Sequence, residues 1–193
     1  MIAIVDYGAG NTGSVSNALS RLSCKHVISA DPEVIRKADK VIIPGVGAAA
    51  PAILHLEELG LDRLIVSLQQ PVLGICLGMQ LLCRSSEEGT TGCLGIFDTE
   101  VRRFRGALPV PHMGWNSLKQ CRGPLFADLP DEPGDVYFVH SFYAAVCRQT
   151  IAVCNYMQPF SAALQQDNFF ATQFHPEKSG STGALILKNF TEL

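Results

Sequence analysis

Residues 71–83 read Pro-Val-Leu-Gly-Ile-Cys-Leu-Gly-Met-Gln-Leu-Leu-Cys. Residues 72–75 form a short apolar run introduced by proline, which is typical of a buried strand. Residues 78–83 continue as an apolar helix, so the strand passes into the helix with almost no loop between them. A join of this kind is typical of β-α units in a largely parallel sheet.

The first half of the chain repeats this alternation, and the second half changes it. We expect strands at residues 2–6, 26–29 and 40–44, and helices at 14–22 and 52–69. Further strands are expected at 98–104, 135–140, 151–155, 161–165 and 169–174, separated by Gly, Pro and Asp turns, before a last helix at 184–190. The predicted fold is α/β, with an open, mostly parallel mixed sheet flanked by helices and antiparallel strands in the second half.

Composition limits the class of protein. The 193 residues are 47% hydrophobic and 17% charged, and we expect residues 1–193 to form one compact domain without disulfide or metal support. Fifteen basic and eighteen acidic residues give a net charge of −3, and no segment gathers the Lys and Arg that a nucleic-acid backbone requires. Nucleic acid is therefore not an expected partner.

The cysteines and the N-terminal residues indicate the compartment. Seven cysteines are scattered without a C-x-x-C pair or a zinc-like spacing with the five histidines, so we expect reduced thiols and no metal site. The first residues lack the basic region of a signal peptide and reach Asp6 too early. The uncharged run at 67–83 is too polar for a transmembrane helix. We expect a soluble cytoplasmic protein without membrane contact.

Cys76 lies at the strand-to-helix join, in the pattern Gly74-Ile75-Cys76-Leu77-Gly78. The pattern matches a thiol version of the nucleophile elbow, whose strained turn needs small residues two before and two after the nucleophile. The helix N-terminus favours the thiolate, and the backbone N–H of Leu77 points where an oxyanion would form. The alternative is a buried structural cysteine in a glycine-containing turn, because cysteine is often buried.

The segment Phe174-His175-Pro176-Glu177 offers a base for this nucleophile, at the end of the strand expected at 169–174. Pro176 excludes the helical region for His175 and fixes its own φ, so we expect residues 175 and 177 to be nearly extended. Glu177 would then project to the same side as His175, fix its tautomer and stabilise its cation. Taken alone, the segment is more typical of a surface turn. Both motifs, however, fall at strand ends, where α/β sheets place their sites.

Two glycine-containing loops follow early strands. Residues 44–47, Pro-Gly-Val-Gly, could supply a second oxyanion donor or serve as an ordinary turn. Residues 8–13, Gly-Ala-Gly-Asn-Thr-Gly, match the G-x-G-x-x-G pattern of dinucleotide-binding proteins, with Asp31 after the next strand. A dinucleotide-binding module is therefore an alternative. It leaves no room for a substrate domain and gives the cysteine and histidine motifs no role.

The sequence around Cys76, Gly-Ile-Cys-Leu-Gly-Met-Gln, and the distant His-Pro-Glu resemble the triad motifs of the class I glutamine amidotransferases. Further blocks resemble one branch of that family, the glutaminase subunits of imidazole glycerol phosphate synthase in histidine biosynthesis. These blocks lie at residues 6–11, 44–47, 111–116, 137–141 and 173–179, and cover the chain nearly from end to end. Pro-His-Met-Gly-Trp-Asn and Val-His-Ser favour this branch. Another ammonia-channelling glutaminase, such as one serving pyridoxal phosphate synthesis, is the alternative.

The resemblance implies an activity: hydrolysis of glutamine through a γ-glutamyl thioester on Cys76, with His175 moving the proton and Glu177 orienting His175. It also implies the residues that surround the substrate. The oxyanion would be held by the amides of Leu77, Gly45, Val46 and Gly47, and glutamine would be bound by Gln80, Glu88, Ser141 and Phe142. The resemblance implies neither a cofactor nor a metal.

A separate partner is implied as well, because the amidotransferase sequence uses the whole chain and leaves no acceptor site. In this family the acceptor site belongs to a β/α-barrel cyclase subunit, which forms a heterodimer with the glutaminase and receives ammonia through a channel. Asn11, Met113, Trp115 and Lys178 lie in the family blocks near the catalytic mouth and are the expected interface residues.

Overall fold

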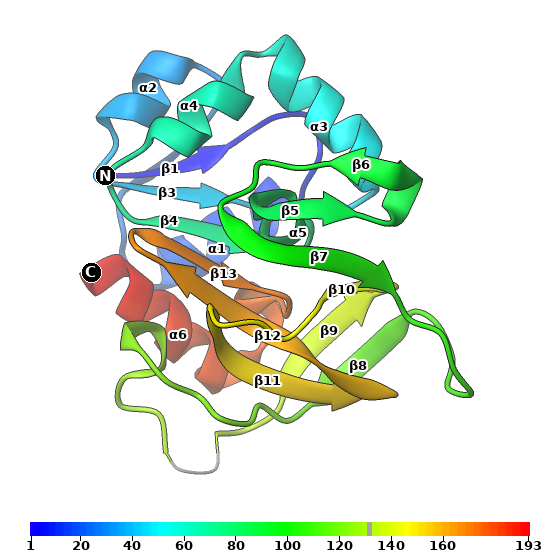
Figure 1. The fold of residues 1–193 in the computed structure, drawn as a ribbon. Helices are drawn as coiled ribbons and strands as arrows, with labels where there is room; N and C mark the ends of the chain where they lie inside the picture. The colour runs from blue at the N-terminus through cyan, green and yellow to red at the C-terminus, as the bar shows by residue number, and fades with distance from the viewer. Residues whose placement is uncertain (131–132) are drawn as a thin grey trace.

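A sheet of seven strands forms the centre of the computed structural model, which describes residues 1–130 and 133–193 (Figure 1). The strands are β1 (Ile2–Val5), β2 (His26–Ser29), β3 (Lys40–Ile43), β4 (Val72–Ile75), β11 (Thr150–Tyr156), β12 (Gln158–Gln166) and β13 (Phe169–Thr172). Their spatial order is β11-β12-β13-β4-β3-β1-β2. The five strands from β13 to β2 are parallel, and β12 pairs antiparallel with both β13 and β11.

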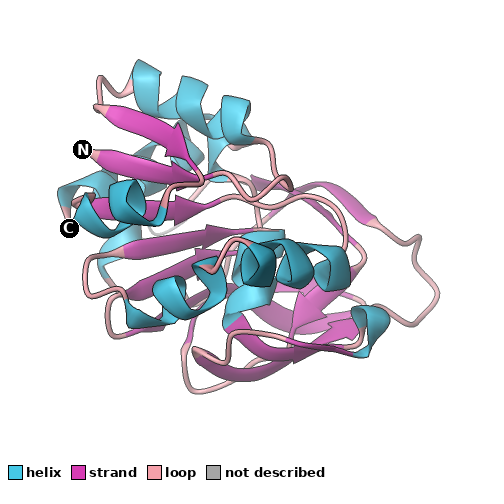
Figure 2. Ribbon diagram, turned by 90° about the horizontal axis from the view of Figure 1, so that it is seen from above, coloured by secondary structure: helices cyan, strands magenta, loops and turns pink. Residues whose placement is uncertain are grey.

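Helices cover both faces of this sheet (Figure 2). α1 (Thr12–Arg21) and α6 (Gly180–Glu192) pack on one face, and α2 (Pro32–Lys37), α3 (Ala49–Glu58), α4 (Leu61–Ser67) and α5 (Leu77–Leu82) pack on the other. Alternate strand residues explain the two layers, because they face opposite sides of the sheet. In β1, Ile2 and Ile4 join the core with α1 and α6, whereas Ala3 and Val5 join the core with α3 and α4. Burial on both faces accounts for the continuous apolar runs of these strands.

Two smaller sheets carry residues of the site. β10 (Phe142–Ala144), β7 (Phe97–Arg103), β5 (Cys83–Ser86) and β6 (Thr91–Gly92) form one sheet in that order. β8 (His112–Asn116) and β9 (Val136–His140) form an antiparallel ribbon. The described residues also form short 3₁₀ turns, η1 (Glu88–Thr90), η2 (Pro124–Phe126) and η3 (Pro176–Lys178). Residues from β9 and β10 line the pocket described below.

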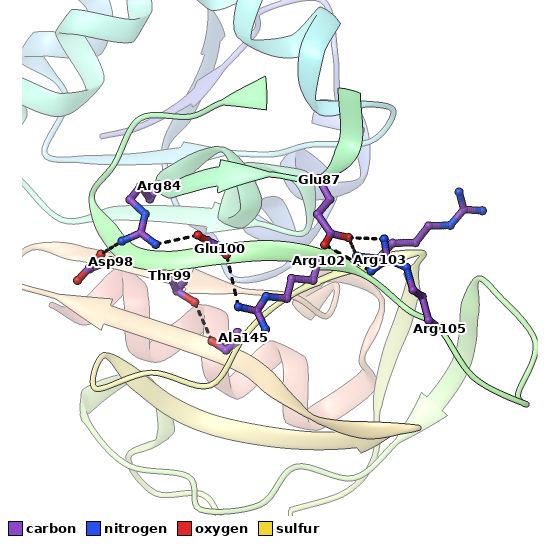
Figure 3. Close-up of polar contacts among 9 residues, drawn as sticks. All are labelled: Arg84, Glu87, Asp98, Thr99, Glu100, Arg102, Arg103, Arg105 and Ala145. Carbon is purple, nitrogen blue, oxygen red and sulfur yellow. Dashed lines mark hydrogen bonds and ion pairs between the residues drawn. The ribbon is translucent and has the colours of Figure 1, made fainter. Parts of the chain in front are cut away.

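A polar network covers the outer face of β5 and β7 (Figure 3). Arg84 contacts both Asp98 and Glu100, and Glu100 also contacts Arg102. These side chains are roughly half-exposed or more, so each ion pair contributes little to stability. The network instead orders the charged side chains along the two strands.

The predicted fold class is confirmed, and most predicted elements lie within a few residues of those observed. The helical stretch expected at 52–69 forms two helices, because α3 and α4 are separated at Gly60. Gly60 has a φ of +64°, a left-handed conformation that glycine adopts without steric strain and that ends a helix. The elements α2, β5, β6, β8 and β10 are not among those expected from the sequence. Within residues 1–130 and 133–193, no helix is long and apolar enough to cross a membrane.

Candidate active site

Cys76 occupies a strained turn between β4 and α5. Its backbone has a φ of 54° and a ψ of −106°, outside the regions that L-residues ordinarily adopt. The flanking glycines allow the strand and the helix to close on each other. A Cβ added at Gly74 would lie 2.8 Å from the carbonyl oxygen of Gly78, and one added at Gly78 would lie 2.0 Å from that of Ile43 on β3. The small residues predicted on both sides of Cys76 are therefore sterically required.

Segments from two other parts of the fold approach the Cys76 thiol, which is 6% exposed. Sγ lies 3.9 Å from the carbonyl oxygen of Val139 on β9. It also accepts a hydrogen bond from Nε2 of Gln173, just after β13, at 3.6 Å. The sulfur is thus held at a junction of the central sheet and the β8–β9 ribbon.

His175 and Glu177 form a buried hydrogen-bonded pair. Nδ1 of His175 lies 2.8 Å from Oε1 of Glu177, and the two side chains are only 3% and 1% exposed. His175 is extended, as expected, with a φ of −95° and a ψ of 95°. The extended conformation expected for Glu177 is wrong, because Pro176–Lys178 form η3. Proline fits the first position of such a turn, and the turn, rather than strand alternation, carries the carboxylate to the ring.

This environment keeps a proton on His175. Burial disfavours the imidazolium, but interactions with Cys76 and with the hydrogen-bonded carboxylate of Glu177 outweigh burial and raise the pKa of His175 to about 10. Nε2 is buried and has no hydrogen-bond partner among the residues that the structure describes. Since Glu177 holds Nδ1, Nε2 is the nitrogen left for proton transfer.

A pocket of about 360 Å³ opens above the thiol. Most of the predicted site residues line it: Val46, Gly47, Cys76, Leu77, Gln80, Glu88, Ser141, Phe142 and His175. Pro111, Val139 and His140 line it as well. Glu177 lies outside the lining, because it is placed behind His175, and Gly45 is also outside it. The structure thus gathers residues from six separate parts of the sequence around one cavity.

In the loop at residues 44–47, after β3, the first two residues are held by contacts and the last two have free space around them. The Tyr7 hydroxyl donates a 2.7 Å hydrogen bond to the carbonyl of Pro44. A Cβ at Gly45 would lie 2.5 Å from the backbone nitrogen of Gly78, so this residue is clamped against α5. Val46 is 43% exposed, and Gly47 has a φ of +106° with open space around it. Any reorientation of an amide toward a substrate is therefore confined to Val46 and Gly47.

Two neighbouring glutamates have different surroundings. The carboxylate of Glu87 accepts a hydrogen bond from the backbone of Arg103 at 2.9 Å and pairs with Arg105 on the outer face (Figure 3). Glu88 lines the pocket, and its Oε2 accepts a hydrogen bond from the backbone of Ala49 at 2.8 Å. Glu88, rather than Glu87, therefore carries negative charge at the pocket, and it also caps the N-terminus of α3.

The amide of Gln80 is oriented by the protein. Its Nε2 donates to the carbonyl of Phe142 and to Oε1 of Gln173, each at 3.0 Å. Both N–H groups are thereby used within the protein, and Oε1 is the atom left to meet a ligand. Gln80 can therefore take its predicted part in substrate binding only through Oε1.

The four expected interface residues differ in their surroundings. Met113 and Trp115 lie two positions apart on β8, and their side chains are 63% and 57% exposed. Large apolar side chains so exposed are typical of a protein-protein contact. Lys178 is exposed in η3. Asn11 already has a structural role, because its Oδ1 caps α1 by accepting from the backbone of Ser14 at 3.1 Å.

The dinucleotide pattern has a structural explanation. The Asp31 carboxylate caps α2 by accepting from the backbone of Glu33 at 2.8 Å. A Cβ at Gly10 would lie 3.2 Å from the carbonyl oxygen of Pro44, so this glycine permits close packing of two loops. The residues that suggested a nucleotide site are therefore used for capping and packing.

Comparison with known proteins supplies the family. A family model described as glutamine amidotransferase class-I matches residues 3–193. The chain belongs to the class I glutamine amidotransferases. Among curated relatives, imidazole glycerol phosphate synthase subunit HisH of Bacteroides fragilis (strain YCH46) is 56% identical over 195 residues, covering 100% of this chain and 99% of the relative. The HisH subunit of Yersinia pestis is 49% identical with the same coverage. The chain is thus a glutamine-hydrolysing enzyme of the HisH branch.

Solved structures of distant amidotransferases share the fold. A glutamine amidotransferase structure superposes with a TM-score of 0.75 at 17% identity, covering 100% of this chain and 98% of the other. A glutamine amidotransferase from Thermotoga maritima gives a TM-score of 0.64 at 16% identity, covering 99% and 82%. At such low identity the similarity concerns the fold alone.

Three features of this amidotransferase site are not predicted from the sequence. These are the Gln173 contact with the Cys76 sulfur, the Tyr7 contact with Pro44, and the approach of the Val139 carbonyl. A signal exists only for Gln173. It is a polar residue at the end of an apolar strand, two positions before the catalytic histidine candidate, so strand alternation places both on one face.

Proposed function

We propose that Cys76, His175 and Glu177 form the catalytic triad that hydrolyses the side-chain amide of glutamine. One observation carries this assignment: a histidine whose Nδ1 is fixed by a buried carboxylate lines the same pocket as a cysteine on a strained strand-to-helix turn. In a triad the base must be held in one tautomer and lie beside the nucleophile. The raised pKa of His175, about 10, gives an imidazolium beside the sulfur of Cys76 at neutral pH.

The reaction proceeds by acyl transfer. The Cys76 sulfur attacks the amide carbon of glutamine, and the carbonyl oxygen becomes an oxyanion. The carbon–nitrogen bond then breaks while His175 gives a proton to the leaving nitrogen, which leaves as ammonia. Water, activated by the now neutral His175, attacks the γ-glutamyl thioester and releases glutamate and the thiolate.

Backbone amides hold the oxyanion, and the pocket holds the rest of the substrate. The first donor is the amide of Leu77, and the second comes from the loop of Gly45, Val46 and Gly47. Within that loop the open segment at Val46 and Gly47 is the part able to turn an amide inward.

The amino-acid end of glutamine occupies the far side of the pocket. Glu88 supplies the negative charge that suits the substrate ammonium, and Gln80 presents its Oε1. The backbone around Ser141 and Phe142 binds the carboxylate. All four residues line the pocket, which supports these roles.

The ammonia is delivered to a separate subunit. The HisH names of the relatives support a β/α-barrel cyclase partner in histidine biosynthesis, acting in the cytoplasm, with residues 1–193 serving as one amidotransferase domain. Met113 and Trp115, with Asn11 and Lys178, form the proposed contact. Closure of this interface protects ammonia from bulk water, where it would be protonated and lose its nucleophilicity.

The deciding experiment measures glutamate release from glutamine by the chain alone, and then with the cyclase subunit and its acceptor nucleotide. We expect weak hydrolysis by the chain alone and strong stimulation in the mixture, with Cys76→Ala as the inactive control. Equal, rapid hydrolysis in both conditions would retain the triad but reject this partner. In that case co-purification would test for another ammonia-channelling synthase.

A further inference from the structure

Gln173 is a buried polar residue that the proposed mechanism does not use. Its side chain is 0% exposed and lies just beyond β13, three of whose four residues are apolar. Its backbone N–H donates to the carbonyl of Ala162 at 2.8 Å, which fixes the residue to β12. Burying an amide costs free energy unless the amide is hydrogen-bonded, so the partners of this side chain explain its presence.

A chain of hydrogen bonds fixes the orientation of this amide. The carbonyl of Phe142 can only accept, so the nitrogen of Gln80, 3.0 Å away, must face it. The same nitrogen supplies its second N–H to Oε1 of Gln173, also at 3.0 Å. The oxygen of Gln173 is thereby turned toward Gln80, and its nitrogen faces the sulfur of Cys76 at 3.6 Å. The orientation follows from the acceptor at the far end of the chain.

An N–H donor directed at sulfur favours one ionisation state. A thiolate accepts hydrogen bonds better than a thiol does, so the donor stabilises the anion that attacks the substrate. The donor also restricts the position of a sulfur that otherwise faces the carbonyl of Val139, which offers no N–H. Holding the attacking atom in place contributes to the rate separately from its ionisation.

We infer that Gln173 is a further catalytic residue, whose amide N–H stabilises and positions the thiolate of Cys76 while Gln80 holds that amide in orientation. This inference rests on the proposed role of Cys76 as nucleophile. It assigns Gln173 a role additional to that of the triad.

The test is the alkylation of Cys76 by iodoacetamide across a pH series, followed residue by residue by mass spectrometry on the full chain. Gln173→Met keeps nearly the same length and removes the N–H donor. We expect the pH of half-maximal alkylation to rise by about one unit, so that the alkylation rate at pH values below both midpoints falls about tenfold. The kcat for glutamine, measured with the partner present, should fall by at least the same factor.

Control variants distinguish the loss of the N–H donor of Gln173 from a loss of packing in the core. Gln166→Met makes the same change on β12, at the residue that pairs with Phe169. Phe169 pairs with Val72 at the start of β4, whereas Cys76 follows the other end of that strand. The Gln166 variant should therefore leave the alkylation profile of Cys76 unchanged. Cys154, 0% exposed, reports unfolding in the same experiment, because it reacts only when the core opens. If Gln173→Met exposes Cys154, Gln173→Leu replaces it as the deciding variant.

The outcomes distinguish this inference from the proposed function. A wild-type alkylation profile in a folded Gln173 variant overturns the inference and leaves the triad intact. Exposure of Cys154 in both variants also overturns it, since Gln173 would then be required for folding. A shifted profile in an enzyme whose wild type releases no glutamate would support the Gln173 contact and reject the proposed reaction.

Discussion

Gly78→Ala tests the steric basis of the Cys76 turn. The added Cβ would lie 2.0 Å from the carbonyl oxygen of Ile43, whereas real Cβ atoms essentially never come closer than 3.0 Å. β3 and α5 must therefore separate by about 1 Å (3.0 − 2.0). Overpacking against backbone costs about 3 kcal/mol, at the upper end of the usual range, because no side chain can rotate away. For a chain of this length the melting temperature should fall by roughly 6–12 °C.

The same displacement moves the nucleophile. Cys76 lies two residues before position 78 on the same tight turn, and a misplacement of about 1 Å lowers catalysis by roughly a hundredfold. Thermal unfolding and partner-stimulated glutamate release would measure the two effects. Gly13→Ala is the matched control, because a Cβ at that position in α1 meets nothing within 4 Å. It should stabilise the protein by about 0.5 kcal/mol and preserve activity. A Gly78→Ala protein as stable and active as this control would refute the steric argument.

Three further predictions follow from polar groups near the site. Burial lowers the pKa of His112 to about 4 and of His140 to about 3, below the ordinary value near 6.5. Below pH 6.5 the unfolded chain therefore binds protons that the folded protein excludes, and the free energy of unfolding falls. Urea titration should show that the free energy of unfolding falls as the pH drops from 6.5 to 4, and that the fall is smaller when His112 is replaced by phenylalanine. Glu88→Gln should raise KM for glutamine roughly 10- to 100-fold by removing a charge from the pocket, whereas steady-state kinetics of Glu87→Gln should show an unchanged KM. Tyr7→Phe should lower the free energy of unfolding by about 1–2 kcal/mol, because it leaves a carbonyl of the glycine loop without its donor; denaturant titration that shows no loss would contradict this hydrogen bond.

Local stereochemistry explains which parts of the fold could be predicted from the sequence. The turn at Cys76 is predictable because the clash that requires Gly74 is with Gly78, within the same five residues, although the distant carbonyl of Ile43 also requires the glycine at position 78. The break at Gly60 is harder to predict, because the apolar spacing of α3 continues into α4 and only the left-handed glycine separates them. The short strands β5 and β10 depend on pairing with β7, so their own sequences contain little signal.

The site divides in the same way, between residues whose chemistry is local and residues whose partners are distant. The expected contact between Glu177 and His175 is present. The backbone that produces it differs from the expectation, because a 3₁₀ turn that begins at Pro176 replaces the extended segment. Gln173 contacts a sulfur 97 positions away, through an amide whose orientation depends on the carbonyl of Phe142 on a third strand. Alternation along β13 indicates the face on which Gln173 lies. Only the assembled sheets show that this face meets the nucleophile, because register and sheet order are set by long-range pairing rather than by neighbouring residues.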